Sequence, residues 1–191
     1  MSTTVVVRKK GTAVIGADTL TKLGYTCERA EYIQHHSKII KVGQNFIGLA
    51  GHASGGLVMT SYFSNLKTTV TLDSPQAVFE MARTMHTSLK EDYFLNPTED
   101  TDDPFESSQF SCLIANRYGI FGLYALRSVQ EYTKFYAFGS GYRFALGAMH
   151  AVYNSKMNAS QIAKAGLAAA AEFDDSTGSP LEIRTVQLKQ A

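Results

Sequence analysis

The sequence predicts an α+β fold in which two antiparallel sheets are flanked by helix pairs, as a four-layer αββα sandwich. The order of the elements carries this prediction: strands, two helices, strands, two helices and a last strand. Strands grouped in this way disfavour alternating βαβ units and a parallel Rossmann-type sheet. With 191 residues, the chain is expected to form a single domain, residues 1–191, that builds its core without disulfides or metals.

Two hairpins are expected at the start of the chain. Residues 3–8 and 12–17 are β-branched runs that a short polar connection ending in glycine separates. Residues 38–42 and 46–50 form a similar pair across a Gly-Gln-Asn connection. Four strands therefore precede the first expected helix, and the amino end of the chain is held in a sheet.

Two helices are expected next. Apolar residues recur at helical spacing across 53–70. The helix after it has Ser74 as N-cap, Pro75 in its first turn and an apolar stripe across 78–89. The polar, acidic segment 96–108 contains two prolines and predicts a loop.

The second half of the chain returns to strands and then to helices. The expected elements are strands at 109–116, 119–126 and 131–138, helices at 141–154 and from Ser160 to 173, and a last strand at 181–188.

The composition disfavours several classes of protein. A net charge of +1 without a long basic run gives no basis for binding nucleic acid or an anionic membrane. Neither a leader peptide nor an apolar run long enough to span a membrane is expected, so the protein is predicted to be cytoplasmic. Cys27 and Cys112 are interpreted as reduced, semi-buried thiols. No cofactor is expected, and His35 and His36 lack further ligands at metal spacing.

The first residues suggest a nucleophile. Ser2 is small, which favours removal of Met1, and the mature chain would then begin with a serine. An α-amine has an ordinary pKa of about 7.7–8.0, so it can accept the hydroxyl proton of its own residue near neutral pH. The alternative is that Ser2 is only a processed terminus without a catalytic role.

Charged residues strengthen the interpretation of Ser2 as a nucleophile. Asp18 ends the second strand of the first hairpin, so it is expected near Ser2 at the open end of that hairpin. Lys38 begins the next strong strand. A carboxylate beside a lysine keeps the ammonium charged and oriented, and the ammonium lowers the pKa of a nearby hydroxyl and amine.

Three turns add further candidates, each with a structural alternative. Gly51 lies in a strand-to-helix turn and could donate its N–H to an oxyanion, or could serve close packing. Ser140 could be a helix N-cap or could direct its hydroxyl into the site. The turn after the last helix offers Asp174, Thr177 and Gly178 as candidates, and its structural alternative is a plain C-terminal turn.

In this order, these pieces resemble the β-type subunits of proteasomes and the HslV-type peptidases, which are N-terminal nucleophile (Ntn) hydrolases. A proteobacterial proteasome-like branch beside HslV also fits. The resemblance covers nearly the whole chain and implies the αββα Ntn-hydrolase fold. The family nucleophile lies sixteen residues before an aspartate, and sixteen residues before Asp18 is Ser2, not Thr3. One departure is that the family usually has threonine where this chain has serine.

The resemblance also implies roles for the other candidates. Lys38 corresponds to the family lysine and Gly51 to the oxyanion-hole glycine. Ser140 corresponds to the serine near the amine of the nucleophile, and Asp174 and Thr177 to the residues that support that amine.

By the same resemblance, a substrate-specificity pocket is expected near four residues. They are Thr21, His36, Leu49 and Ala53. Their mixture suggests a modest, partly apolar pocket.

The resemblance implies a threonine/serine-type endopeptidase that cleaves peptides or unfolded proteins through an acyl-enzyme. Such subunits form homo-oligomeric stacked rings, whose size stays open, and depend on a separate ATPase unfoldase to degrade folded proteins. Two alternatives stay open: an Ntn amidase that acts on small molecules, and a catalytically silent ring scaffold if Met1 is retained, because Met1 would acylate the required amine.

Overall fold

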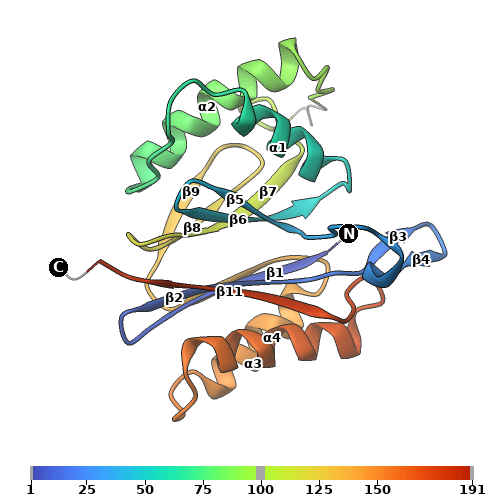
Figure 1. Ribbon diagram of the computed structural model, residues 1–191, viewed down its shortest axis with the longest axis vertical. Helices are drawn as coiled ribbons and strands as arrows, with labels where there is room; N and C mark the ends of the chain where they lie inside the picture. Colours follow the sequence, from blue (N-terminus) through green and yellow to red (C-terminus); the bar gives the residue numbers. More distant parts are fainter. Residues whose placement is uncertain (1, 98–101, 190–191) are drawn as a thin grey trace.

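The computed structural model describes residues 2–97 and 102–189. Figure 1 shows the order of its layers: a helix pair, a sheet, a second sheet and another helix pair. Both large sheets are antiparallel, which confirms the predicted class and the predicted grouping of strands and helices. Of the helices in the described part of the chain, none is long and apolar enough to span a membrane.

The first sheet joins the two ends of the chain in the strand order β10-β1-β2-β11. Its strands are β1 (Thr3–Lys9), β2 (Thr12–Asp18), β10 (Phe135–Gly139) and β11 (Leu181–Gln187). The predicted opening hairpin is confirmed, with Val5 opposite Gly16. In the other direction, Leu181 of β11 pairs with Asp18. The last strand therefore lies beside the end of the hairpin that carries Asp18.

The second sheet has the strand order β5-β6-β7-β8-β9. Its strands are β5 (Ile39–Val42), β6 (Asn45–Gly51), β7 (Phe110–Ala115), β8 (Ile120–Leu123) and β9 (Val129–Tyr132). Between the sheets, Gly48 lets the strands approach closely. A Cβ at Gly48 would lie 3.1 Å from Ile15 Cδ1 and 3.3 Å from Thr4 Cγ2.

The helices cover the outer faces of the sheets (Figure 1). They are α1 (Gly55–Ser64), α2 (Pro75–Glu91), α3 (Tyr142–Val152) and α4 (Ala159–Phe173). The start of α2 is as predicted, because Ser74 Oγ accepts a hydrogen bond from Ala77 N and Pro75 occupies the first turn.

Three predicted boundaries were wrong. The first helix ends at Ser64, so the apolar residues up to position 70 pack on the core from a loop. The strand expected at 131–138 is two strands, β9 and β10, which belong to different sheets. The cap of α4 is Asn158 and not Ser160, because Asn158 and Gln161 form a reciprocal capping box. The boundary between β9 and β10 was missed because strand-forming residues lie on both sides of a tight turn.

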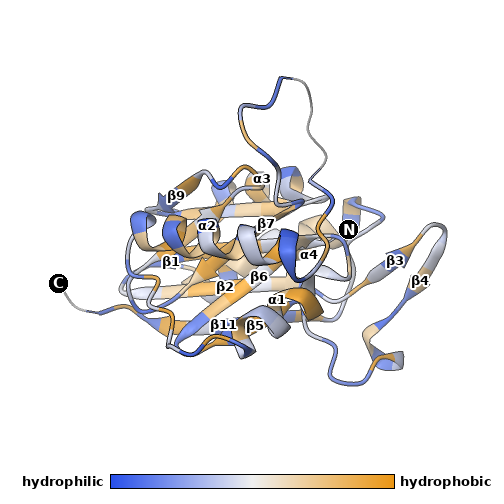
Figure 2. Ribbon diagram, turned by 90° about the horizontal axis from the view of Figure 1, so that it is seen from above, coloured by the Kyte–Doolittle hydropathy of each residue, from blue (hydrophilic) through white to orange (hydrophobic). Residues whose placement is uncertain are grey.

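A short two-stranded ribbon was missing from the prediction. It consists of β3 (Thr21–Leu23) and β4 (Thr26–Glu28), followed by a single 3₁₀ turn, η1 (Ala30–Tyr32). Six strands therefore precede the first α-helix instead of four. Figure 2 shows that this ribbon projects from the body of the molecule. Strands of three residues are too short to give a period-2 pattern.

The cysteines differ from each other. Cys112 is fully buried, and burial raises the pKa of its thiol to about 12. Cys27 is exposed on β4, so the expectation of two semi-buried thiols was wrong. Both are free thiols.

The acidic segment 96–108 lies partly outside the described residues, at 98–101. In its described part, Glu106 forms an ion pair with Lys90 and bonds to His86 Nε2 at 3.1 Å. His86 Nδ1 lies 2.9 Å from Ser108 Oγ. Although serine, histidine and glutamate resemble a hydrolase triad, Ser108 is only 3% exposed. The cluster therefore fastens the segment to α2.

Candidate active site

The beginning of β1 is fixed by buried hydrogen bonds. Thr3 N donates to Asp18 Oδ1 at 2.9 Å, and Gly141 N donates to Thr3 Oγ1 at 2.9 Å. Thr3 is fully buried, so its hydroxyl is unavailable to a substrate. Ser2 is the residue that reaches a cavity. Met1, whose removal the sequence favours, lies outside the described residues.

Asp18 and Lys38 form the predicted ion pair. Lys38 Nζ lies 3.0 Å from each carboxylate oxygen of Asp18 and also donates to Leu20 O. Asp18 is fully buried, and its Oδ2 accepts further bonds from Leu20 N at 3.0 Å and Gly178 N at 3.1 Å. Charge-assisted bonds to a buried carboxylate fix its orientation. Asp18 therefore holds both the backbone of Thr3 and the ammonium of Lys38.

Burial lowers the pKa of the Lys38 ammonium below its ordinary value of 10.5, while the charge of Asp18 and its hydrogen bonds act in the opposite direction. We therefore expect Lys38 to titrate with a midpoint below 10.5, as measured by NMR of its ε-methylene group. Asp18→Asn removes the charge that favours the ammonium, so the midpoint should fall further. A midpoint at or above 10.5 in the native protein would contradict this account.

A chain of hydroxyl groups connects Thr3 to Asp174. Thr3 Oγ1 lies 2.6 Å from Thr177 Oγ1, and Thr177 Oγ1 donates to Asp174 Oδ2. Because each hydroxyl has one proton, Thr3 must donate to Thr177. Ser140 Oγ also donates to Asp174 Oδ2, at 2.6 Å. Asp174 Oδ2 thus accepts hydrogen bonds from two hydroxyl groups, those of Thr177 and Ser140.

The N–H and the hydroxyl group of Ser140 both form hydrogen bonds at this site. Its N–H donates to Ser2 O at 3.0 Å, and its hydroxyl bonds to Asp174 as described above. The N-cap position of α3 is Gly141, without a side-chain cap bond, so the helix-cap interpretation of Ser140 was wrong. Next to it, Gly139 has φ +104°, and a Cβ there would lie 1.6 Å from Ser2 O. Only glycine lets β10 approach the start of β1 in this way.

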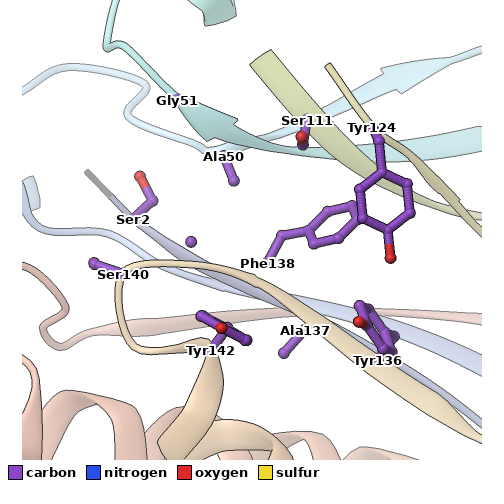
Figure 3. Close-up of a pocket in the computed structure, with 11 residues that line it drawn as sticks. Ser2, Ala50, Gly51, Ser111, Tyr124, Tyr136, Ala137, Phe138, Ser140 and Tyr142 are labelled. Atoms are coloured by element: carbon purple, nitrogen blue, oxygen red, sulfur yellow. The ribbon is translucent and has the colours of Figure 1, made fainter. Parts of the chain in front are cut away.

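A cavity of about 490 Å³ opens beside Ser2. Gly51 and Ser140 line it together with Ser2, and Figure 3 shows Ser2 and Ser140 at one side of it. Gly51 is the last residue of β6 and has φ +156°, four residues before α1 begins. The structure therefore brings Ser2, Gly51 and Ser140 to one cavity, and hydrogen bonds connect Ser140 to Ser2 and to Asp174.

The four residues expected at the specificity pocket lie elsewhere. Thr21 begins β3, and His36 Nε2 lies 2.9 Å from Thr19 O. Leu49 packs against the core under α2, and Ala53 is exposed between β6 and α1. None of these four lines the cavity beside Ser2. Their role in specificity stays a prediction.

Sequence reasoning missed the aromatic residues that line the rest of the cavity. They are Tyr124, Tyr136, Phe138 and Tyr142. Tyr136 and Phe138 alternate along β10, a pattern that would have been visible if that strand had been bounded correctly.

The described part of the chain shows no candidate metal site. Among residues 2–97 and 102–189, no group of three or more His, Cys, Asp or Glu side chains is arranged to hold a metal ion.

The geometry matches a known structure over nearly the whole chain. BPH from Thiobacillus denitrificans is 43% identical and superposes with a TM-score of 0.94, covering 99% of this chain and 100% of that one. The chain belongs to the proteasome-type Ntn hydrolases. The same relative has also been solved in complex with epoxomicin, at 43% identity and a TM-score of 0.93, covering 98% of this chain and 100% of that one.

The eukaryotic HslV of Trypanosoma brucei shares the proteasome-type fold with this chain. It is 19% identical, with a TM-score of 0.71, and the match covers 97% of this chain and 99% of that one. At this identity the likeness concerns the fold alone. No protein-family model and no curated protein matches the chain.

Proposed function

We propose that this chain is the peptidase subunit of a proteasome-like complex and that Ser2 is its nucleophile. One observation carries the proposal most strongly: Ser2 reaches a cavity, whereas the hydroxyl of Thr3 is buried in a hydrogen-bond chain. The 43% identical BPH has been solved with epoxomicin, which supports a ligand-binding site of the same kind here. The layers in Figure 1 fit a single αββα Ntn-hydrolase domain.

In the proposed reaction, Met1 is removed and the free amine of Ser2 takes the proton from Ser2 Oγ. Ser2 Oγ attacks the peptide carbonyl, and Gly51 N–H stabilises the oxyanion. The protonated amine then gives its proton to the leaving nitrogen, and the C–N bond breaks. The remaining ester is hydrolysed by water, with the same amine acting as base.

The surrounding residues prepare this reaction. The Lys38 ammonium, oriented by Asp18, favours the deprotonated forms of the hydroxyl and the amine. Ser140, Asp174 and Thr177 support the amine through their shared hydrogen bonds. The part of the substrate before the scissile bond, its acyl side, is held by the four residues of the expected specificity pocket: Thr21, His36, Leu49 and Ala53. Homo-oligomeric stacked rings would enclose the site, with a separate ATPase supplying unfolded protein.

Mass spectrometry tests this proposal on the purified full chain. We expect the intact mass to lack Met1, and we expect epoxomicin to modify the peptide that begins with Ser2 and to stop hydrolysis of an unfolded protein such as reduced casein. Serum albumin in its folded form is the matched control substrate and should stay intact without an unfoldase. A chain that retains Met1 and still hydrolyses casein would exclude the terminal amine as base.

A further inference from the structure

The side chains that line the cavity beside Ser2 are uncharged. None of its eleven lining residues is acidic, basic or histidine. Its volume of about 490 Å³ lies within the range of about 300–1,000 Å³ that is typical of ligand sites. The pKa of Tyr136 is raised mainly by hydrogen bonding with Tyr124 and to a smaller extent by burial, so its phenol stays neutral near pH 7. Such walls favour an apolar occupant.

The aromatic wall has a fixed shape. Phe138 makes edge contacts with Tyr124, at a centroid distance of 4.8 Å, and with Tyr136, at 5.7 Å. Tyr136 stacks on Tyr132 at 4.3 Å, and the hydroxyl groups of Tyr132 and Tyr124 lie 3.0 Å apart. Rings that hold one another in this way form a preorganised surface. Figure 3 shows Tyr124 and Tyr136 at the side of the cavity away from Ser2.

Ser2 has two distinct flanks. On the side of β2, Asp18 accepts a bond from Thr3 N and pairs with Lys38, and the ribbon that follows begins with Thr21. On the other flank is Ser140, whose N–H bonds to Ser2 O and whose side chain lies at the cavity. A peptide bond that Ser2 attacks therefore has a different surface available on each side.

The strand β6 contributes one residue to each of the two proposed binding surfaces. Leu49 packs toward the core under α2, whereas its neighbour Ala50 lines the cavity between the sheets. Successive side chains of a strand point to opposite faces. Leu49, which is proposed for the acyl side of the substrate, and Ala50, which lines the cavity, thus lie on opposite faces of β6.

We infer that the cavity is the subsite for the substrate residue directly after the scissile bond and that it prefers an aromatic or large aliphatic side chain there. This inference rests on the proposed function. The leaving nitrogen takes its proton from the Ser2 amine, which Ser140 and Asp174 are proposed to support, and Ser140 lies at the cavity. The leaving residue is then directed toward Ser140 and the aromatic wall.

Interception of the acyl-enzyme tests the subsite directly. A short peptide with a fluorogenic leaving amine acylates Ser2, and either glycinamide or phenylalaninamide is added as acceptor. The acceptor nitrogen attacks the ester carbonyl, the new C–N bond replaces the bond to Ser2 Oγ, and the proton returns to that oxygen. We expect phenylalaninamide to intercept the acyl-enzyme about tenfold better than glycinamide, judged by the transfer product in mass spectrometry.

Two variants locate this preference. Ser111 lines the cavity from β7, so Ser111→Leu should fill it and reduce the tenfold preference to near unity. Tyr142→Ala removes part of the aromatic wall and should reduce it as well, which provides a second variant if the first fails to fold. Ser64→Leu makes the same substitution at an exposed position at the end of α1 and should leave the preference unchanged.

The outcomes separate the two proposals. Equal interception by both amides, or a preference that both cavity variants retain, would overturn the subsite while leaving the peptidase intact. If the cavity variants change only the preference for the substrate residue before the scissile bond, the cavity belongs to the acyl side, and the inference is likewise overturned. Absence of any fluorogenic hydrolysis would instead contradict the proposed function.

Discussion

Ser2→Ala is expected to lower peptide hydrolysis by about 10⁴- to 10⁶-fold, the loss typical of removing a catalytic nucleophile. Alanine is as small as serine, so Met1 should still be removed and the terminal amine should still be free. The substitution deletes only the hydroxyl at the cavity, and Ser2 O keeps its bond from Ser140 N. The measurement is kcat/KM on a fluorogenic peptide, with thermal unfolding as the check on the fold.

Thr4→Val is the matched control, because Thr4 is the third hydroxyl residue in the same run. Thr4 is fully buried, and its Oγ1 finds no hydrogen-bond partner among the described residues. Valine has nearly the same shape, and removing an unpaired buried hydroxyl is neutral or stabilising. Activity should therefore stay within about twofold of the native value. Full activity in Ser2→Ala would exclude Ser2 as the nucleophile.

Local signals in the sequence predicted the parts of the site that are close in the chain. The opening hairpin was recognisable from β-branched runs around a glycine, and it placed Asp18 at the end that also carries Ser2. The ion pair with Lys38 followed from the next strand and from the family resemblance. These inferences succeeded because each depends on fewer than about forty residues of chain, within which turn chemistry fixes geometry.

Long-range contacts were out of reach for local patterns, and only the family resemblance indicated that Ser140, Asp174 and Thr177 lie near Ser2. Thr3 and Thr177 are separated by 174 positions, and nothing in either local pattern indicates that their hydroxyl groups meet. The aromatic cavity was missed because one run of strand-forming residues contains both β9 and β10. The turn between them moves β10 into the other sheet, beside β1, and only that crossing brings Tyr136 and Phe138 to Ser2.

Lys38→Met is expected to reduce both activity and stability. The Asp18 side chain is fully buried and that of Lys38 is 10% exposed, so the variant leaves a buried carboxylate without its counter-charge. Breaking such a pair costs about 3–5 kcal/mol, and we expect the lower end, because Asp18 keeps three backbone N–H donors. Urea unfolding gives the free energy of unfolding. We expect kcat to fall by about 10²–10⁴-fold, in the range of lost general acid–base or electrostatic assistance.

The double variant Asp18→Asn/Lys38→Met distinguishes the two effects. Removing both charges removes the unpaired carboxylate, so part of the lost stability should return, while the Lys38 ammonium is still missing and activity should stay low. A double-mutant cycle on the free energy of unfolding then gives the coupling between the two side chains. Recovery of activity together with stability would show that Lys38 acts only by holding the fold, and the proposed tuning of Ser2 by its charge would be wrong.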